Sequence, residues 1–409
     1  MQGLFLVELF ELYHHYNVHE DSGRGVAELV SAARSAGLGY EMQSNFVDGP
    51  VDADSEWRRW GYNEERKRYS PSKDNPGTLI LRTLFAIYAL TTLLFAVTTL
   101  DLVPSSLMLS PSEINLTLPC DEDVYSASSP AAWKTLFITR KRLPSFSQCF
   151  QDLLHTSKCT VQTFSGRFSM FGGLALIVAL NAEIHRHLFK NTSNCVENPV
   201  ILQEKFELGL KAWEFAWRSH PHASLSVTNS PFGPLAADLV PLLNLAYVRL
   251  FADTSRALAV HHPVGNVFPF LTAENGGMSN AAIRIRVLKA VGYAINSLYL
   301  SEWFVGMLGH SSSATASSPQ KRNWSFVAPF AGLESAVVVG TWLDRLVELR
   351  CPVRDPEAKF LGRMDRVFPN SGVKRPGAEG RRIIDVWGVL CDEDVMRALP
   401  STGHFQQCY

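Results

Sequence analysis

The stretch that most constrains this chain is an uncharged run of eighteen residues at 83–100, with the sequence TLFAIYALTTLLFAVTTL. This length reaches the threshold for a membrane-spanning helix. However, five of the eighteen residues are Thr, charged residues (Arg82 and Asp101) flank the run directly, and no aromatic or basic anchor follows it. A helix that is apolar on all sides is also typical of the centre of a helical bundle. We therefore expect a buried helix of a soluble protein, with a membrane span at 83–100 as the alternative.

Composition places the chain among globular proteins. It has 409 residues, of which 46% are hydrophobic and 19% charged, and its formal net charge is −1. A nucleic-acid-binding module usually carries excess positive charge, which this chain lacks. Its seven cysteines are odd in number and none are spaced as C-x-x-C. This pattern favours reduced thiols in the cytosol or nucleus and excludes a zinc cluster within the chain.

The hydrophobic periodicity is close to 3.6 residues in every long segment, which predicts an all-α fold built as a large multi-helix array. Residues 43–56 are polar and predict a loop, while two prolines favour an extended path through 107–127. Pro241 is expected to kink or restart the helix that contains it. The expected helices cover 4–16, 25–36, 83–100, 128–137, 144–155, 164–189, 201–217, 235–251, 280–303, 333–347 and 383–390.

No arrangement of residues in the sequence predicts catalysis. The chain has no G-x-S-x-G, no P-loop and no dinucleotide-binding glycine motif. The histidine pairs at 14/15, 185/187, 220/222 and 261/262 are adjacent or two apart, so the two members of a pair do not share a helix face as a zinc site would require. We therefore predict no catalytic, cofactor-binding or metal-binding residues, and we keep an all-α enzyme as a second alternative. Trp57 and Trp60 share one helix side, which predicts core packing or, alternatively, a ligand-facing cage.

Several short motifs occur in a particular order along the chain. They are R-x-x-G-L at 34–38, W-x-x-W at 57–60, an acidic-then-basic run at 64–68, S-E…L-P-C at 112–120, L-A-Y-x-R-L at 245–250 and E-x-A…W-L at 334–343. In this order they resemble the regulatory domain of fungal-specific transcription factors. The signature residues, which the resemblance implies are mainly structural, are Trp57, Trp60, Glu64, Arg68, Glu113, Pro119, Cys120, Trp133, Tyr247, Arg249 and Trp342.

The resemblance also implies a function and a domain organisation. The family's helical domain lies downstream of a zinc-cluster or Cys₂His₂ DNA-binding module in nuclear regulators of RNA polymerase II transcription. It is thought to hold regulatory, effector-response or dimer contacts. Here we expect this domain at 1–350, with 69–82 as an insertion, and a C-terminal helical or irregular extension at 351–409.

The DNA-binding module of that family is missing from this sequence. The first helical pattern starts almost at residue 1, which suggests a truncated gene model that has lost the module. We therefore expect zinc and DNA contacts only through the missing module, and no cofactor in this chain. The expected partners are the transcription machinery or co-regulators, with a homodimer as a further expected assembly. We expect no membrane association and a nuclear location.

Overall fold

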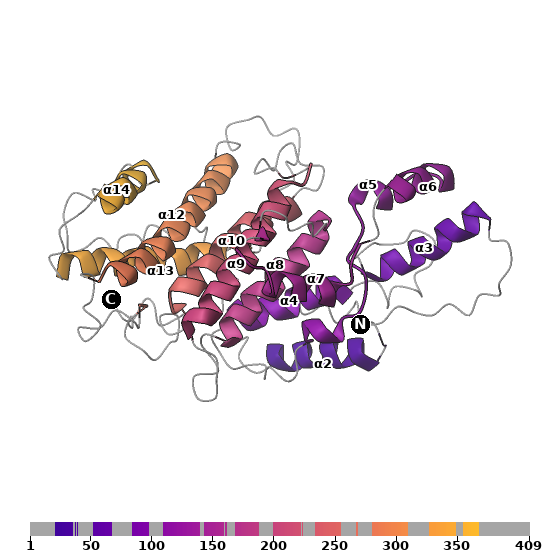
Figure 1. Cartoon of the computed structure of the whole chain (residues 1–409), viewed down its shortest axis with the longest axis horizontal. Coiled ribbons are helices and arrows are strands. Elements are labelled where there is room, and N and C mark those ends of the chain that lie inside the picture. The colour runs from indigo at the N-terminus through magenta and orange to yellow at the C-terminus, as the bar shows by residue number, and fades with distance from the viewer. Residues whose placement is uncertain are drawn as a thin grey trace. The chain divides into compact units, whose positions relative to one another are not determined.

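A computed structural model describes the chain over its helical segments. The described residues are 21–35, 37, 39, 52–67, 84–97, 109–139, 143–158, 160–161, 168–187, 199–221, 223, 234–254, 267–268, 280–309, 327–348 and 355–367. Within them the fold is all-α, as predicted, with α-helices and one short 3₁₀ turn (Figure 1). Extended pairing among these residues is limited to an isolated antiparallel bridge between Thr117 and Ser145.

Contacts within the chain divide it into two units. Unit 1 comprises Met1–Ala182 with Leu208–Ala223, and unit 2 comprises Glu183–Glu207 with Ser224–Tyr409. The division falls within two long helices, α8 (Met170–His185) and α9 (Pro199–Arg218). We describe each unit by itself.

The uncharged run forms α4 (Leu84–Val97), which is covered by protein in unit 1. Four of its large side chains are at most 1% exposed: Leu84, Phe85, Ile87 and Tyr88. Its threonines fit a buried helix because their hydroxyls can bond to the preceding turn, as Thr91 does to the carbonyl oxygen of Ile87 at 2.8 Å. Among the described helices, none combines the length and the apolar character needed to cross a membrane.

Other helices of unit 1 surround α4. Rings on α4 contact Phe146 of α7 edge-on, with centroid distances of 5.4 and 5.3 Å. Helix α9 approaches α7 closely at Gly209, where a Cβ atom would lie 3.0 Å from the carbonyl oxygen of Leu153. The remaining elements of this unit are α2 (Asp21–Ser35), α3 (Ala53–Lys67), η3 (Pro111–Glu113), α5 (Glu122–Tyr125), α6 (Pro130–Thr139) and α7 (Phe146–Leu154).

Several helix boundaries follow the capping signals in the sequence. Gly37, two positions after the last residue of α2, has φ +60°, the conformation expected of a glycine that ends a helix. At the start of α6, the hydroxyl of Ser129 accepts a hydrogen bond from the backbone N–H of Ala132, and Pro130 occupies the first turn. Ser145 caps α7 in the same way, through the N–H of Gln148.

Three helices form the centre of unit 2. Helices α10 (Pro234–Phe251), α12 (Ala281–Gly309) and α13 (Val327–Glu348) pack against one another, and α14 (Asp355–Val367) packs on α12. Helix α10 continues through Pro241 as a single element. The helix expected at 201–217 is α9, and its Phe206, in the part of α9 that belongs to unit 2, is 1% exposed.

Three segments differ from the sequence-based prediction. Residues 122–125 lie in the stretch expected to be extended but form the single turn α5. Residues 53–56 were expected in a loop but form the first turn of α3, because Asp52 caps it by accepting a 2.6 Å hydrogen bond from the N–H of Ser55. Residues 355–367 were expected to be irregular but form α14, whose Asp-Pro opening places proline in the first turn. The predicted helices at 4–16 and 383–390 and the predicted insertion at 69–82 lie outside the described residues.

Candidate functional site

The R-x-x-G-L and S-E…L-P-C motifs of unit 1 are joined by an ion pair. Arg34, in the last turn of α2, donates from Nε and Nη2 to the two carboxylate oxygens of Glu113, each at 3.0 Å. These hydrogen bonds hold the pKa of Glu113 below its usual range, although burial acts in the opposite direction. The same carboxylate closes a capping box around η3 by accepting from the N–H of Ser110 at 2.7 Å. Glu113 therefore ties α2 to the extended arm that follows α4.

The L-P-C motif is fastened to the acidic run of α3. Glu64 is 2% exposed, and its Oε1 accepts a 2.6 Å hydrogen bond from the backbone N–H of Cys120. Pro119, immediately before this residue, is also buried. A buried backbone N–H without an acceptor would destabilise the fold, and a carboxylate is a strong acceptor for it. Glu64 consequently fixes the arm against α3.

The tryptophans of W-x-x-W are half-buried and pack against the start of α5 and against α6. Trp57 and Trp60 lie against a core cluster of Cys120, Val124 and Trp133. The ring centroids of Trp60 and Trp133 are 5.3 Å apart. The two tryptophans of α3 therefore contribute to the packing of this cluster.

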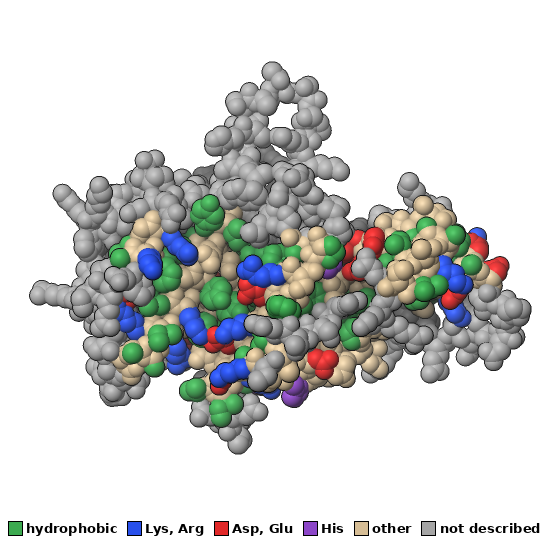
Figure 2. All heavy atoms as spheres, turned by 45° about the horizontal axis from the view of Figure 1, so that its top comes forward, with side chains coloured by type: hydrophobic (Ala, Val, Ile, Leu, Met, Phe, Trp, Pro, Cys, Tyr) green, Lys and Arg blue, Asp and Glu red, His purple; other side chains and the backbone are tan. Residues whose placement is uncertain are grey.

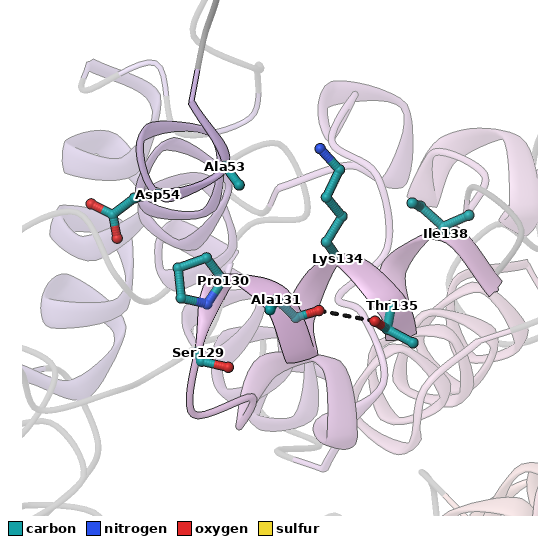
Figure 3. A pocket seen from close by; sticks show the side chains of 8 residues that line it. All are labelled: Ala53, Asp54, Ser129, Pro130, Ala131, Lys134, Thr135 and Ile138. Carbon is teal, nitrogen blue, oxygen red and sulfur yellow. Dashed lines mark hydrogen bonds between the residues drawn. The ribbon is translucent and has the colours of Figure 1, made fainter.

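Beside this cluster the surface between α3 and α6 is hollowed. Figure 3 shows that the first turn of α3 contributes two lining residues and that α6 with its preceding turn contributes the rest. The lining residues are Ala53, Asp54, Ser129, Pro130, Ala131, Lys134, Thr135 and Ile138.

The hollow has a volume of about 600 Å³ and its lining is mainly apolar. Two of its charges are already paired with neighbours, Lys134 with Glu56 at 3.5 Å and Asp54 with Arg58 at 2.8 Å. Ile138 is 70% exposed at one end. An open, apolar hollow suits a side chain of a protein partner, whereas small-molecule sites enclose most of their ligand.

The two cysteines of unit 1 that the structure describes, Cys120 and Cys149, are not arranged for nucleophilic chemistry. Burial raises the pKa of the Cys149 thiol to about 12, and Asp152 adds to this effect. A thiol of this kind is protonated at neutral pH and is a poor nucleophile. Cys120 is also buried and directs its Sγ to the carbonyl oxygen of Asp121 at 3.3 Å.

The histidine pair at the end of α8 is engaged in local contacts. Nε2 of His187 lies 2.8 Å from Oε1 of Glu183, and Arg186 pairs with the other oxygen of this carboxylate. Burial raises the pKa of Glu183, but the hydrogen bond from His187 and the charge of Arg186 outweigh it and lower the pKa overall. No group of three or more potential metal ligands occurs among the described residues.

In unit 2 the motif residues of α10 and α13 meet in a buried ion pair. Arg249 is 3% exposed and Glu334 is 2% exposed. Nε of Arg249 donates to Oε2 of the carboxylate at 2.9 Å, and Nη2 pairs with Oε1. Thr254 adds a third hydrogen bond to Oε2 at 2.6 Å. The L-A-Y-x-R-L and E-x-A motifs are thus two halves of one contact.

The aromatic residues of these motifs also have defined neighbours. Tyr247 stacks on Tyr293 of α12 with ring centroids 3.9 Å apart and an interplanar angle of 6°. Trp342 is 1% exposed and meets Phe360 of α14 edge-on at 6.5 Å. Both motif residues are therefore part of the helix packing of unit 2.

The predicted signature residues are divided between the two units, and several of them contact other residues than one another. In unit 1 these are Trp57, Trp60, Glu64, Glu113, Pro119, Cys120 and Trp133, and in unit 2 they are Tyr247, Arg249 and Trp342. Arg68 lies outside the described residues. Sequence reasoning missed Thr254 and the pair between Arg284 and Glu357, because nothing local in the sequence identifies a partner that lies far along the chain.

On the face shown in Figure 2, positively and negatively charged side chains of the described residues lie interspersed, and no continuous basic area is visible there. The described part of this face thus offers no obvious surface for nucleic-acid phosphates. Comparison with known proteins adds no assignment: no protein-family model matches the chain, and searches of curated proteins and of solved structures find no match either.

Proposed function

We propose that this chain is a helical regulatory domain of a nuclear transcription regulator and that it acts through protein contacts. The observation that supports this proposal is the mutual pairing of the motif residues. Arg34 and Glu113 are 79 positions apart, Glu64 and Cys120 are 56 apart, and Arg249 and Glu334 are 85 apart, yet each pair is bonded directly.

This pairing bears on the resemblance because the motifs were identified individually, without knowledge of their contacts. Here each motif that carries a charged residue uses it to bind another motif of the same set. The resemblance is therefore consistent with the way in which each unit is built.

Protein contact is the mode of action that the surface favours. The hollow between α3 and α6 is apolar and open, and Phe137 and Ile138 beside it are 39% and 70% exposed. Exposed apolar side chains next to a hollow are typical of protein-binding surfaces. The carboxylates of Glu64 and Glu334 are bound within the fold, so they support packing rather than acid–base chemistry.

A tethering experiment tests the proposal. The full chain is fused to a sequence-specific DNA-binding module from another protein and tested on reporters for both activation and repression. We expect reporter transcription to change relative to the module alone and the fusion to accumulate in the nucleus. A Trp133→Ala fusion, which disrupts the α3–α6 cluster, should lose the effect, whereas Arg218→Ala, at an exposed surface pair, should retain it.

The contradicting result is equally clear. A fusion that is folded and occupies its DNA site, but changes neither reporter, would refute a regulatory role. Cell fractionation adds a second test, because enrichment of the untethered chain outside the nucleus would also count against the proposal.

A further inference from the structure

Helix α14 is held on unit 2 by one face. Glu357 and Phe360 are three positions apart and therefore share a side of the helix. Glu357 is completely buried, and its Oε1 accepts a 2.6 Å hydrogen bond from Nε of Arg284 in the first turn of α12. Lys359 and Arg363 are exposed. The helix is thus amphipathic, with one acidic and one aromatic anchor.

The aromatic anchor occupies a place that α12 and α13 form together. A Cβ atom at Gly292 of α12 would lie 3.2 Å from Cζ of Phe360, so the glycine leaves room for the ring. Trp342 of α13 meets the same ring edge-on, with an interplanar angle of 84°. Edge-to-face contacts of this kind contribute beyond simple area burial. The receiving surface therefore has a cationic position at Arg284 and an aromatic position at Gly292 and Trp342.

The ion pair of α14 is less complete than the other buried ion pair of unit 2. Nε and Nη2 of Arg284 both contact Oε1 of Glu357, and Oε2 of this carboxylate has no hydrogen-bond partner among the described residues. In contrast, Arg249 engages both oxygens of Glu334, and Thr254 adds a further bond, while Nη1 of Arg249 has no hydrogen-bond partner among the described residues. A buried ion pair stabilises only when its remaining bonding capacity is satisfied. The carboxylate that holds α14 is therefore less fully satisfied than the carboxylate of Glu334.

We propose that the surface around Arg284, Gly292 and Trp342 is a helix-binding site and that α14 is its releasable occupant within the chain. The partner that fits this site is an amphipathic helix carrying a glutamate and, three residues later, an aromatic residue. Such a helix competes with α14, so binding of the partner and release of α14 are one event.

Charge and shape define this partner. Arg284 is 7% exposed with α14 in place, so a replacing helix that lacked a carboxylate would leave a buried cation unpaired. Bulk at Gly292 would exclude the aromatic side chain, because the open space is created by the absence of a Cβ atom. Recognition by an acidic and an aromatic anchor on one face is the helix-in-groove mode of binding.

Hydrogen exchange on the unaltered full chain is the first test. We expect the backbone amides of α14 to exchange at least about a hundredfold faster than those in the middle of α12, because local opening needs less free energy than unfolding of the unit. Equal protection of α14 and α12, with both exchanging only through unfolding of the whole unit, would overturn the proposal. This measurement needs no variant, so it stands even where a substitution impairs folding.

Peptide binding is the second test. The probe is a fluorescent peptide of residues 355–367, added to the full chain carrying Glu357→Lys and Phe360→Ala, which empties the site. We expect saturable binding to this variant and binding at least about tenfold weaker to the unaltered chain, where α14 occupies the site. A control peptide with the same two substitutions should not bind. Gly362→Ala, at a position with no atom within 4 Å of the added Cβ, is the matched control for the chain.

The outcomes separate clearly. A folded, emptied variant that binds neither peptide, or binds both equally, would refute a helix-binding site. Restored pairing is a stricter criterion: Arg284→Glu in the emptied variant should abolish binding of the native peptide and favour a peptide with Glu357→Arg. Because neither test depends on transcription, failure here and failure of the tethering experiment are distinguishable.

Discussion

The buried pair between Arg249 and Glu334 gives the most direct test of how unit 2 is stabilised. Glu334→Ala would leave the guanidinium of Arg249 buried at 3% exposure and would also remove the acceptor of Thr254. Breaking a buried ion pair by removing one partner costs about 3–5 kcal/mol. We therefore expect the free energy of unfolding to fall by this amount. At a urea m-value of about 2–3 kcal/mol/M, the midpoint moves by roughly 1–2.5 M.

The same reasoning predicts a different result when both partners are replaced. Arg249→Met combined with Glu334→Leu removes both charges together and keeps apolar volume between α10 and α13. Replacement of a whole buried ion pair by apolar residues is often nearly neutral. We expect the double variant to be more stable than either single variant, which corresponds to a large coupling energy in a double-mutant cycle.

An exposed ion pair of this chain serves as the control. Arg218 and Glu214 have the same chemistry at 2.7 Å, but the Arg218 side chain is 68% exposed on α9. Arg218→Ala should therefore change stability by only about 0.3–0.5 kcal/mol. Urea denaturation followed by circular dichroism measures all variants, with hydrogen exchange in α10 and α13 reporting on unit 2. A loss below about 1 kcal/mol for Glu334→Ala would refute the reasoning.

Three further predictions concern unit 1. Gly39→Ala should destabilise it, because the added Cβ would lie 2.5 Å from the carbonyl oxygen of Glu113. Gly61→Ala should instead stabilise it by about 0.5–1 kcal/mol, because Gly61 lies within α3 and no atom is within 4 Å of the added Cβ. Thermal denaturation compares the two variants. The pKa of Glu113 is lowered in the folded chain, so its carboxylate stabilises the fold at pH values above its unfolded pKa. This stabilisation is lost as the pH falls through the folded pKa. The Glu113→Gln variant should therefore lose less stability than the unaltered chain when the pH is lowered. Cys149, with a pKa of about 12, should resist thiol reagents at pH 8 until the chain unfolds, and rapid labelling of the folded chain would contradict this.

The helical fold was largely predictable because the signals for a helix come from residues that are close in sequence. The 3.6-residue pattern predicted helices at 201–217 and 235–251, and the structure has α9 at Pro199–Arg218 and α10 at Pro234–Phe251. Gly37 after α2 and the Ser-Pro opening of α6 lie where those helices end and begin. Each signal comes from residues within a few positions of one another, so it requires no knowledge of the rest of the chain.

The parts that sequence reasoning missed have non-local or weak local causes. Helix α14 is short, has few apolar residues and lies in a basic region rich in Pro and Gly. Its amphipathic pattern is therefore only a weak signal for a helix. Its stabilisation comes from Arg284, which lies 73 positions from Glu357. The pairing of Arg249 with Glu334 was equally hidden, although both residues belonged to recognised motifs. A charged residue in a helix does not reveal its partner until the helices pack.

Polar contacts explain how helices with largely apolar surfaces adopt one packing arrangement. Within unit 1, Nε1 of Trp213 donates to the carbonyl oxygen of Gly173 at 3.0 Å, and within unit 2, Gln203 donates to that of Leu250 at 2.6 Å. Apolar surfaces alone permit several alignments of similar free energy, but sliding one helix by a turn would leave such buried groups unpaired. We expect the Arg249→Met/Glu334→Leu variant to keep most of its stability but to lose the preference for one alignment of α10 and α13. Broadened NMR signals from α10 and α13 would reveal the loss, and sharp native-like signals would show that apolar packing alone sets the alignment.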